Sequence, residues 1–463
     1  MAYTTVANAP RIGVVQFPGT NCGRETELAI TRAGMRPVPF LWNEDRGLLR
    51  SLDGYVLAGG FSYEDRSRSG IIAALDPVMT AILRENEQGK PVLGICNGAQ
   101  MLVESGLVPG VALTTNRRVL AGRILGTGFY NAWVTLRRET IAPSSTGVFT
   151  GDLQAGELIR VPAAHAEGRF VLTAEALRLV EEKGLVAFRY TDAAGVPLPE
   201  FPVNPNGSTA NIAALTNEAG TAMAIMPHPE RTAAGDGIFR SLRAYLVTHG
   251  HGDARFRFHS RGEPYSVAPS SSPASAAAPP PATPPPPPPE PLPVYQPDPD
   301  TEQVVVELII TDNAAVSVEN ALNRRGIPVS IRRRVHWELR LREELSPEER
   351  EELLRRVHGT GELYNENKER LTAAPSGSGR EGPSFTLLVR ERDDVIGPRT
   401  QQALQDWFGC RGIESLRRGV LWTIRPADEA THAGPVDPAG RVEAVLATTI
   451  LMNPVSQEGF QYV

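Results

Sequence analysis

The feature that most constrains this chain is a proline-rich segment between about residues 264 and 300. Proline lacks a backbone N–H donor and fixes φ, so a run of prolines can form neither a helix nor a sheet ladder. The segment is predicted to be a semi-rigid, largely polyproline-like spacer. A docking site for proline-binding domains is the alternative interpretation. Either way, it divides the 463-residue chain into two parts, each of which is long enough to bury a core.

The longer N-terminal part alternates short apolar runs with helical patterns. Strands that alternate with helices indicate a mostly parallel sheet covered on both faces. Catalytic groups in such sheets lie at the carboxyl ends of the strands. The sequence therefore predicts one α/β domain over residues 1–255 and a linker over residues 256–301. The first four predicted strands are residues 11–17, 37–42, 53–60 and 90–96.

The C-terminal part changes to small α+β patterns. Each of two units is predicted to have the order βαββαβ, with two short strands in its middle. Residues 331–339 match residues 416–424 by letter, which aligns Trp337 with Trp422. We interpret this match as an internal duplication, the alternative being a coincidence between two short ferredoxin-like patterns. The predicted units are residues 302–375 and 383–463.

Cys96 lies in the most informative segment of the chain. An apolar strand runs into this cysteine, which has Gly94 two residues before it and Gly98 two residues after it. That spacing is typical of a nucleophile elbow, in which small neighbours accommodate strained backbone angles. The turn would place the sulfur at a helix N-terminus, where the helix dipole favours the thiolate. A buried core cysteine before a glycine-rich turn is the alternative.

His228 and Glu230 supply partners for such a thiol. Pro227 and Pro229 force an extended backbone around them, and residues two apart in an extended chain point the same way. The imidazole would serve as base for the thiol and later protonate the leaving group, while the carboxylate orients the ring. The three residues together predict a Cys–His–Glu triad.

A third element follows the predicted strand at residues 53–60. Gly59 and Gly60 end this strand, so backbone amides can approach a substrate there without interference from Cβ atoms. The amide of Gly60 or Phe61 can then lie opposite the amide of Asn97 as an oxyanion hole. An ordinary turn at the end of a strand is the alternative.

These motifs together resemble the class I glutamine amidotransferases of the triad type. Within that class the chain is similar to the glutaminase subunits of phosphoribosylformylglycinamidine synthase, over residues 11–245. The segments that carry this second resemblance are residues 17–22, 59–65, 163–170 and 204–208. The resemblance implies a flavodoxin-like fold with a mostly parallel sheet, and hydrolysis of glutamine to supply ammonia for purine biosynthesis.

The resemblance also implies roles for individual residues. It assigns catalysis to Cys96, His228 and Glu230, and glutamine contacts to Gly59, Gly60, Phe61 and Gln100. His165 and Glu167 lie in a family motif near the active-site rim. The chain departs from the family at three positions: Ala58 stands where the family usually has proline, Glu64 where it usually has glycine, and Ala99 where it usually has a bulkier aromatic residue. These departures put the loop geometry and the partner contacts in question. Cys22 has no elbow around it and is interpreted as structural.

The C-terminal part resembles the small bridging subunit of the same synthase, present here as two copies. This resemblance implies self-association through the C-terminal repeats and contact with the large ligase subunit. The chain has no glycine-rich phosphate loop of the Walker type. ATP and Mg²⁺ are therefore expected on the ligase, and no cofactor is expected in this chain.

Composition limits the remaining function classes. The net charge of −6 gives no global basic field for nucleic acid. Three scattered cysteines form neither a disulfide framework nor a metal-binding spacing, so no metal is expected. The sequence shows no signal peptide and no apolar run of membrane-spanning length, so a cytoplasmic location is expected. Two rival functions stay open: a cysteine amidase without an ammonia acceptor, and a non-catalytic bridging scaffold.

Overall fold

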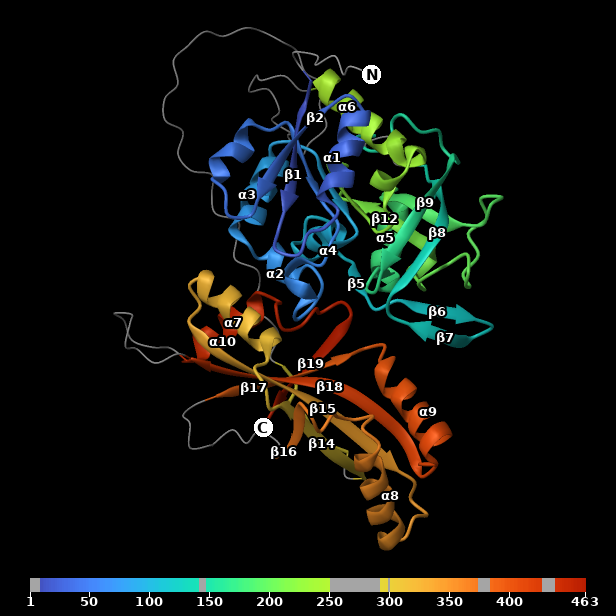
Figure 1. The fold of residues 1–463 in the computed structure, drawn as a ribbon, viewed down its shortest axis with the longest axis vertical. Helices are drawn as coiled ribbons and strands as arrows, with labels where there is room; N and C mark the ends of the chain where they lie inside the picture. The colour runs from blue at the N-terminus through green and yellow to red at the C-terminus, as the bar shows by residue number, and fades with distance from the viewer. Residues whose placement is uncertain (1–8, 141–146, 250–291, 299, 374–383, 427–437) are drawn as a thin grey trace.

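The computed structural model describes two sheet-containing bodies joined in one chain. The described residues are 9–140, 147–249, 292–298, 300–373, 384–426 and 438–463. Figure 1 shows the N-terminal body above, in blue to green, and the C-terminal body below, in yellow to red. The predicted order, an α/β amidotransferase domain followed by a smaller sheet region, is confirmed.

The N-terminal body is built on a nine-stranded sheet of order β2-β1-β3-β4-β13-β12-β11-β8-β9. The first five strands are parallel, and each later strand pairs antiparallel with its neighbour. The parallel strands are β1 (Arg11–Gln16), β2 (Arg36–Leu41), β3 (Gly54–Leu57), β4 (Val92–Ile95) and β13 (Ala222–Ile225). The others are β8 (Tyr130–Arg138), β9 (Leu158–His165), β11 (Val186–Thr191) and β12 (Ile212–Thr216). Every residue of β3, β4 and β13 is buried, as expected for strands covered on both faces.

Helices pack around this sheet (Figure 1). They are α1 (Gly23–Arg32), α2 (Ile71–Ala74), α3 (Pro77–Glu87), α4 (Asn97–Glu104), α5 (Ala174–Glu182) and α6 (Asp236–His249). Local signals explain their ends: the Asp76 side chain accepts a hydrogen bond from the Val78 amide at the start of α3. Gly34 has φ 79° just after α1, the left-handed conformation in which glycine commonly ends a helix. Two short pairs complete the body: β5 (Ala112–Thr114) with β10 (Arg169–Val171), and the hairpin of β6 (Arg117–Leu120) and β7 (Arg123–Thr127).

The C-terminal body is a six-stranded antiparallel sheet of order β16-β14-β15-β18-β17-β19. Its strands are β14 (Thr301–Leu308), β15 (Val329–Leu341), β16 (Glu369–Thr372), β17 (Phe385–Glu391), β18 (Ile413–Pro426) and β19 (Gln457–Tyr462). Its helices are α7 (Asn313–Arg324), α8 (Pro347–Gly359), α9 (Ile396–Phe408) and α10 (Pro438–Ala447). A capping box is present at the start of α8, between Ser346 and Glu349.

The middle of each predicted unit differs from the expected pair of short strands. β15 is one strand of 13 residues and β18 is one strand of 14 residues. Residues 331–341 contain no Gly, Pro, Asn or Asp, so nothing in them favours a turn. Gly419 in β18 is not among the residues with positive φ, so it continues the strand. The two units therefore share one continuous sheet through the pairing of β15 with β18.

The register of β15 and β18 relates to the sequence match between the units. Trp337 lies opposite Arg418, and Arg333 lies opposite Trp422, with Val335 opposite Val420 at the centre. The sequence match aligns Trp337 with Trp422 and residue 333 with residue 418. If each residue is replaced by its aligned counterpart in the other unit, the pair of Trp337 and Arg418 becomes the pair of Trp422 and Arg333. Two copies related by a two-fold axis would have this register. The duplication remains a prediction.

The predicted linker and domain boundaries fall partly outside the described residues, since 250–291 are not described. Segment 292–298 lies against β19: the Tyr295 amide donates to the Gln461 carbonyl at 2.7 Å. The Tyr295 ring also stacks on Tyr462 with 5.2 Å between centroids. The end of the proline-rich segment is thus packed on the C-terminal sheet.

Candidate active site

Cys96 follows β4 directly and precedes α4, at the tip of a strained turn. Its φ is 52° and its ψ is −107°, an unusual conformation for a residue with a side chain. A Cβ on Gly94 would lie 2.5 Å from the Gly98 carbonyl oxygen, and a Cβ on Gly98 would lie 2.0 Å from the Leu57 carbonyl oxygen. Only glycine fits at both places, so this turn has the close packing expected of a nucleophile elbow.

The sheet brings His228 to Cys96 although 131 intervening residues separate them in the sequence. β13 is the parallel neighbour of β4, with Ile225 paired to Ile95, so both strands end at the same edge. Cys96 comes one residue after β4, and His228 comes three residues after β13. The His228 amide donates to the Pro162 carbonyl at 2.8 Å, which fixes the backbone there.

His228 and Glu230 form a buried pair. The His228 Nδ1 and the Glu230 Oε1 are 2.6 Å apart, and each residue is 1% exposed. The other ring nitrogen, Nε2, has no hydrogen-bond partner among the described residues. Burial alone would lower the pKa of His228, but the Cys96 thiolate, together with Cys22 and Glu230, raises this pKa well above 6.5. The arrangement favours the protonated form of His228.

His165, the last residue of β9, is buried in the same region. It is 5% exposed, and its Nδ1 lies 3.2 Å from the Asn116 Oδ1. Burial and the positive charge of His228 lower the pKa of His165 to about 3, so its ring is neutral at ordinary pH. The preceding residue, Ala164, accepts a hydrogen bond from the Cys96 sulfur at 3.7 Å. His165 therefore lies in the buried wall of the site.

The glycine loop after β3 faces the catalytic pair. A Cβ on Gly59 would lie 3.1 Å from the His228 Cε1, so glycine lets the imidazole pack against the backbone. The Phe61 amide donates to the Gly19 carbonyl at 3.0 Å and is therefore occupied. Among the described residues, the Gly60 amide has no backbone acceptor. The Asn97 amide, in the first turn of α4, has no carbonyl one turn before it to bond.

The side chains of Asn97 and Gln100 are both engaged within the protein. The Asn97 Oδ1 accepts from the Ser62 amide at 2.9 Å, and its Nδ2 donates to the Gln100 Oε1 at 2.8 Å. The Gln100 Nε2 in turn donates to the Glu167 carbonyl at 2.5 Å. Gln100 thus joins α4 to the segment that carries His165, and its amide does not project freely toward a substrate.

The segment after Phe61 is strained. Tyr63, Glu64, Asp65 and Ser67 all have positive φ, between 51° and 69°. Such conformations cost about 1–3 kcal/mol each for residues other than glycine and persist only where surrounding contacts impose them. The resemblance noted above places a glycine where Glu64 stands, and Glu64 has φ 57°. Neighbouring structure must therefore hold this segment in place.

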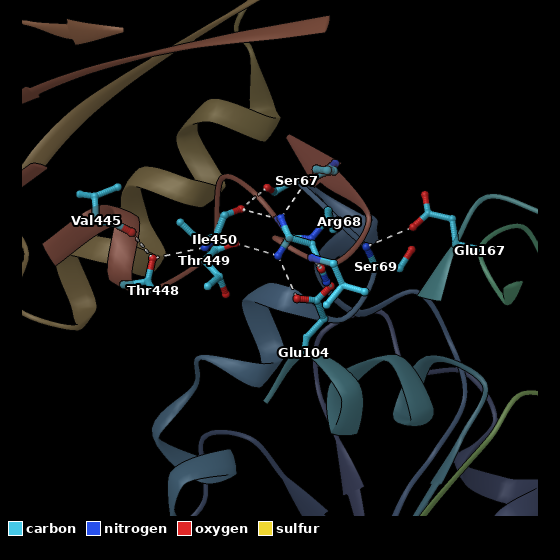
Figure 2. A network of polar contacts seen from close by, with 12 residues as sticks. Ser67, Arg68, Ser69, Glu104, Glu167, Val445, Thr448, Thr449 and Ile450 are labelled. Carbon is cyan, nitrogen blue, oxygen red and sulfur yellow. Dashed lines mark hydrogen bonds and ion pairs between the residues drawn. The ribbon is translucent and has the colours of Figure 1, made fainter. Parts of the chain in front are cut away.

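Part of that support comes from the C-terminal body, as Figure 2 shows. The Ser67 hydroxyl donates to the Ile450 carbonyl at 2.6 Å. The Arg68 Nη2 donates to the Thr449 carbonyl at 2.7 Å and forms an ion pair with Glu104 on α4 at 2.8 Å. The side chains of Arg68 and Glu104 are 11% and 6% exposed, so this pair is buried. The C-terminal body therefore contacts both the strained segment and the helix that begins at the nucleophile.

Cys22, which is interpreted from the sequence as structural, lies beside the catalytic pair. It is 2% exposed, and its sulfur accepts a hydrogen bond from the Arg231 Nη2 at 3.0 Å. Cys22, His228 and Glu230 have ligand atoms within 4.8 Å of one another. Among the described residues, these three form the group whose spacing could hold a cation. The Arg231 guanidinium already places a positive charge against the Cys22 sulfur, which disfavours a metal ion there. The signal available in the sequence was the position of Cys22 at the end of the motif at residues 17–22.

The comparisons with known proteins agree with this geometry. Residues 9–237 match the CobB/CobQ-like glutamine amidotransferase domain family. The phosphoribosylformylglycinamidine synthase subunit PurQ of Methanothrix thermoacetophila is 46% identical over 259 residues, covering 51% of this chain and 98% of that protein. The chain belongs to the PurQ family.

Two further similar proteins also match 51% of this chain. The subunit PurQ of Chlorobaculum parvum is 43% identical over 245 residues, covering 51% of this chain and 90% of that protein. One chain in the structure of PurLQS from Thermotoga maritima is 33% identical, with a TM-score of 0.42, and the match covers 51% of this chain and 99% of that chain. Membership of the PurQ family confirms the resemblance inferred for the N-terminal part, and the chain is a glutamine amidotransferase. The resemblance of the C-terminal part to a bridging subunit remains a prediction.

In the part of the chain that the structure describes, no helix has the length and apolar character needed to span a membrane.

Proposed function

We propose that the chain is the glutaminase component of phosphoribosylformylglycinamidine synthase, with Cys96, His228 and Glu230 as catalytic residues. The observation that carries the assignment is the buried 2.6 Å contact between His228 and Glu230 at the strand end beside the Cys96 elbow. The carboxylate fixes the ring by its Nδ1, so Nε2 is free to exchange protons with the sulfur and the substrate.

In the proposed reaction the Cys96 thiolate attacks the side-chain carbonyl carbon of glutamine and forms a C–S bond. The His228 imidazolium donates its proton to the amide nitrogen, the C–N bond breaks, and ammonia leaves a glutamyl thioester. Neutral His228 then takes a proton from water, and the resulting hydroxide attacks the thioester. The C–S bond breaks, which releases glutamate and restores the thiolate and the imidazolium.

The oxyanion donors in this proposal are the amides of Gly60 and Asn97. Phe61 was an equal candidate from the sequence, but its amide donates to the Gly19 carbonyl. Gly60 has φ 157°, and a Cβ there would lie 2.7 Å from the Gly19 carbonyl oxygen, so this position needs glycine. The proposed glutamine contacts come from the backbone of the Gly59–Gly60–Phe61 loop. Gln100, Glu167 and His165 are proposed to position that loop and α4 rather than to bind the substrate.

The proposal extends to a partner and to the C-terminal body. The ammonia would pass to a separate ligase subunit, which uses ATP and Mg²⁺ to convert formylglycinamide ribonucleotide to the amidine. The two C-terminal repeats would provide bridging contacts to that ligase and a surface for self-association. We also propose a cytoplasmic location, and domain boundaries at residues 1–255, 256–301, 302–375 and 383–463.

The test is reconstitution of the full chain with the ligase subunit of the same synthase. Amidine formation would be measured with glutamine and, separately, with ammonium chloride. Cys96→Ala should reduce glutamine-dependent synthesis by about 10⁴-fold or more and leave ammonia-dependent synthesis intact. Cys410→Ala, at a buried thiol of the C-terminal body, is the matched control and should retain both activities. Glutamine-dependent synthesis by the Cys96→Ala chain would refute the proposal.

A further inference from the structure

A cavity of about 550 Å³ lies at the seam between the two bodies. Its walls come from the N-terminal body through the 3₁₀ helix η1 (Arg46–Ser51) and α3, and from the C-terminal body through the end of α7. Five arginine side chains line it: Arg46, Arg50, Arg84, Arg324 and Arg325. This concentration of positive charge stands out in a chain whose net charge is −6.

The charges of this arginine cavity are only partly compensated within the protein, since the buried Asp76 carboxylate interacts electrostatically with Arg324 and Arg46. Across the described residues, the side chains of Arg46, Arg50 and Arg84 make no hydrogen bond or ion pair. The one carboxylate in the lining, Glu85, is paired with Lys90 at 2.6 Å. Like charges around one recess repel one another, so an anion that enters it would remove an unfavourable interaction as well as form new ones.

Arg324, the last residue of α7, and Arg325, which follows it, also join the bodies. The Arg325 Nη1 donates to the Leu75 carbonyl at 3.1 Å, and the Arg324 guanidinium lies 5.7 Å from the centroid of the Tyr63 ring. Tyr63 belongs to the strained segment beside the active site. The position of α7 against the N-terminal body therefore sets the shape of the cavity.

The chemistry of the lining selects the ligand. Guanidinium groups bind phosphate oxygens through paired N–H donors, and several of them suit an anion that carries several charges. The cavity volume lies in the range of about 300–1,000 Å³ that is usual for small-molecule sites. We propose that the arginine cavity binds a small polyphosphate anion, either a nucleoside triphosphate or an inorganic polyphosphate, across the seam between the two bodies. The bound anion fastens α7 to α3 and η1.

Binding would be measured by isothermal titration of the full chain with tripolyphosphate, ATP and adenosine, without added metal. Tripolyphosphate and ATP should bind at one site, adenosine should not, and the affinity should fall between about 50 and 300 mM salt because the contacts are ionic. Tighter binding of ATP than of tripolyphosphate would support a nucleotide ligand, and equal binding would support recognition of the phosphate chain alone. The absence of binding by both anions up to about 1 mM would overturn the proposal.

Variants test whether binding occurs in this cavity. Arg84→Gln, from the N-terminal body, and Arg325→Gln, from the C-terminal body, should each weaken binding by about tenfold, because each removes one charge-assisted contact. The matched control is Arg178→Gln on α5, whose side chain is 59% exposed and pairs with Glu182. Circular dichroism would establish that each variant is folded. Equal weakening by the control, or unchanged affinity in both cavity variants, would locate the anion elsewhere and refute the site.

Discussion

Backbone strain at single residues marks the functional region of this chain. Cys96 has φ 52°, and Tyr63, Glu64, Asp65 and Ser67 have positive φ in the segment that follows the glycine loop. The strain at Cys96 could be predicted, because the flanking glycines are visible in the sequence. The strain at Glu64 could not be predicted from the residue type, because glutamate has no preference for a left-handed backbone.

Glu64→Gly should therefore stabilise the protein. Glycine removes the steric cost of the left-handed conformation, although it gives the unfolded chain more freedom, so the net gain should be about 0.5–1 kcal/mol. The exposed ion pair of Glu64 with Arg66 contributes little, since the Glu64 side chain is 76% exposed. Glu64→Ala removes the same ion pair but keeps the Cβ, so it should bring no gain. Urea denaturation would measure both, and equal stabilities of the two variants would contradict the explanation.

Cys22→Ala should lower kcat/KM for glutamine by about tenfold, because Arg231 loses its sulfur acceptor. The Arg231 guanidinium lies 3.7 Å from the Glu230 Oε1 and would then compete with His228 for that oxygen. A weaker contact with Glu230 lowers the pKa of His228, so the basic limb of the pH–rate profile should move to lower pH. Cys410→Ala should leave the profile unchanged. An unaltered rate and profile in Cys22→Ala would mean that this thiol only fills space.

Among the secondary-structure elements, the long strands of the C-terminal sheet show where sequence patterns were insufficient. Strands were predicted correctly around residues 331–334 and 336–341, but the alternation of side chains does not show whether two neighbouring segments form one strand or two. Pairing with β18 along the whole length of β15 decides the matter. The same pairing buries His336 completely, with the rings of Tyr295 and Tyr462 edge-on at 5.6 and 5.8 Å.

Burial of His336 should make the C-terminal sheet sensitive to acid. Burial and the charge of Arg390 lower the pKa of His336 from 6.5 to about 4. Between these values the unfolded chain binds a proton that the folded chain does not, so stability falls as the pH decreases through this window. His336→Leu places at this position the residue found at the aligned Leu421. The free energy of unfolding of this variant, relative to that of the parent chain, should be about 2 kcal/mol higher at about pH 5 than at about pH 8. Urea denaturation of both chains at both pH values would measure this gain. The same difference in stability between variant and parent at pH 5 and at pH 8 would contradict the prediction.

The whole molecule is organised around the seam between its two bodies. Ile71 and Ile72 of α2 are buried in one cluster with Val318 of α7 and Val445 of α10, so the bodies share apolar core. The buried pair of Arg68 and Glu104 lies at the same seam, with the Asn453 side chain donating to Glu104 at 3.2 Å. The C-terminal body therefore packs against α4, the helix that begins beside Cys96.

Breaking the Arg68–Glu104 pair should destabilise the full chain strongly. Arg68→Met or Glu104→Met leaves one charge buried without its partner, which costs about 3–5 kcal/mol, while the double replacement should cost less than the sum. A double-mutant cycle by urea denaturation would measure the coupling. The exposed pair of Arg178 and Glu182 is the matched control and should show a coupling below about 1 kcal/mol. Equal couplings for the two pairs would show that the seam does not bury the charges of Arg68 and Glu104.

The sequence by itself determined the local features of this protein. The elbow at Cys96, the paired orientation of His228 and Glu230, the glycine loop and the early strands depend on residue type and short spacing, which act within a few residues. Only the tertiary structure decided which of these groups meet and which atoms are free. The pairing of β13 with β4 brings His228 to Cys96, the Gly19 carbonyl occupies the Phe61 amide, and contact with the C-terminal body holds Ser67 at the end of the strained segment. Contacts of this kind join residues far apart in the chain, and their energies depend on burial and geometry that no local pattern encodes.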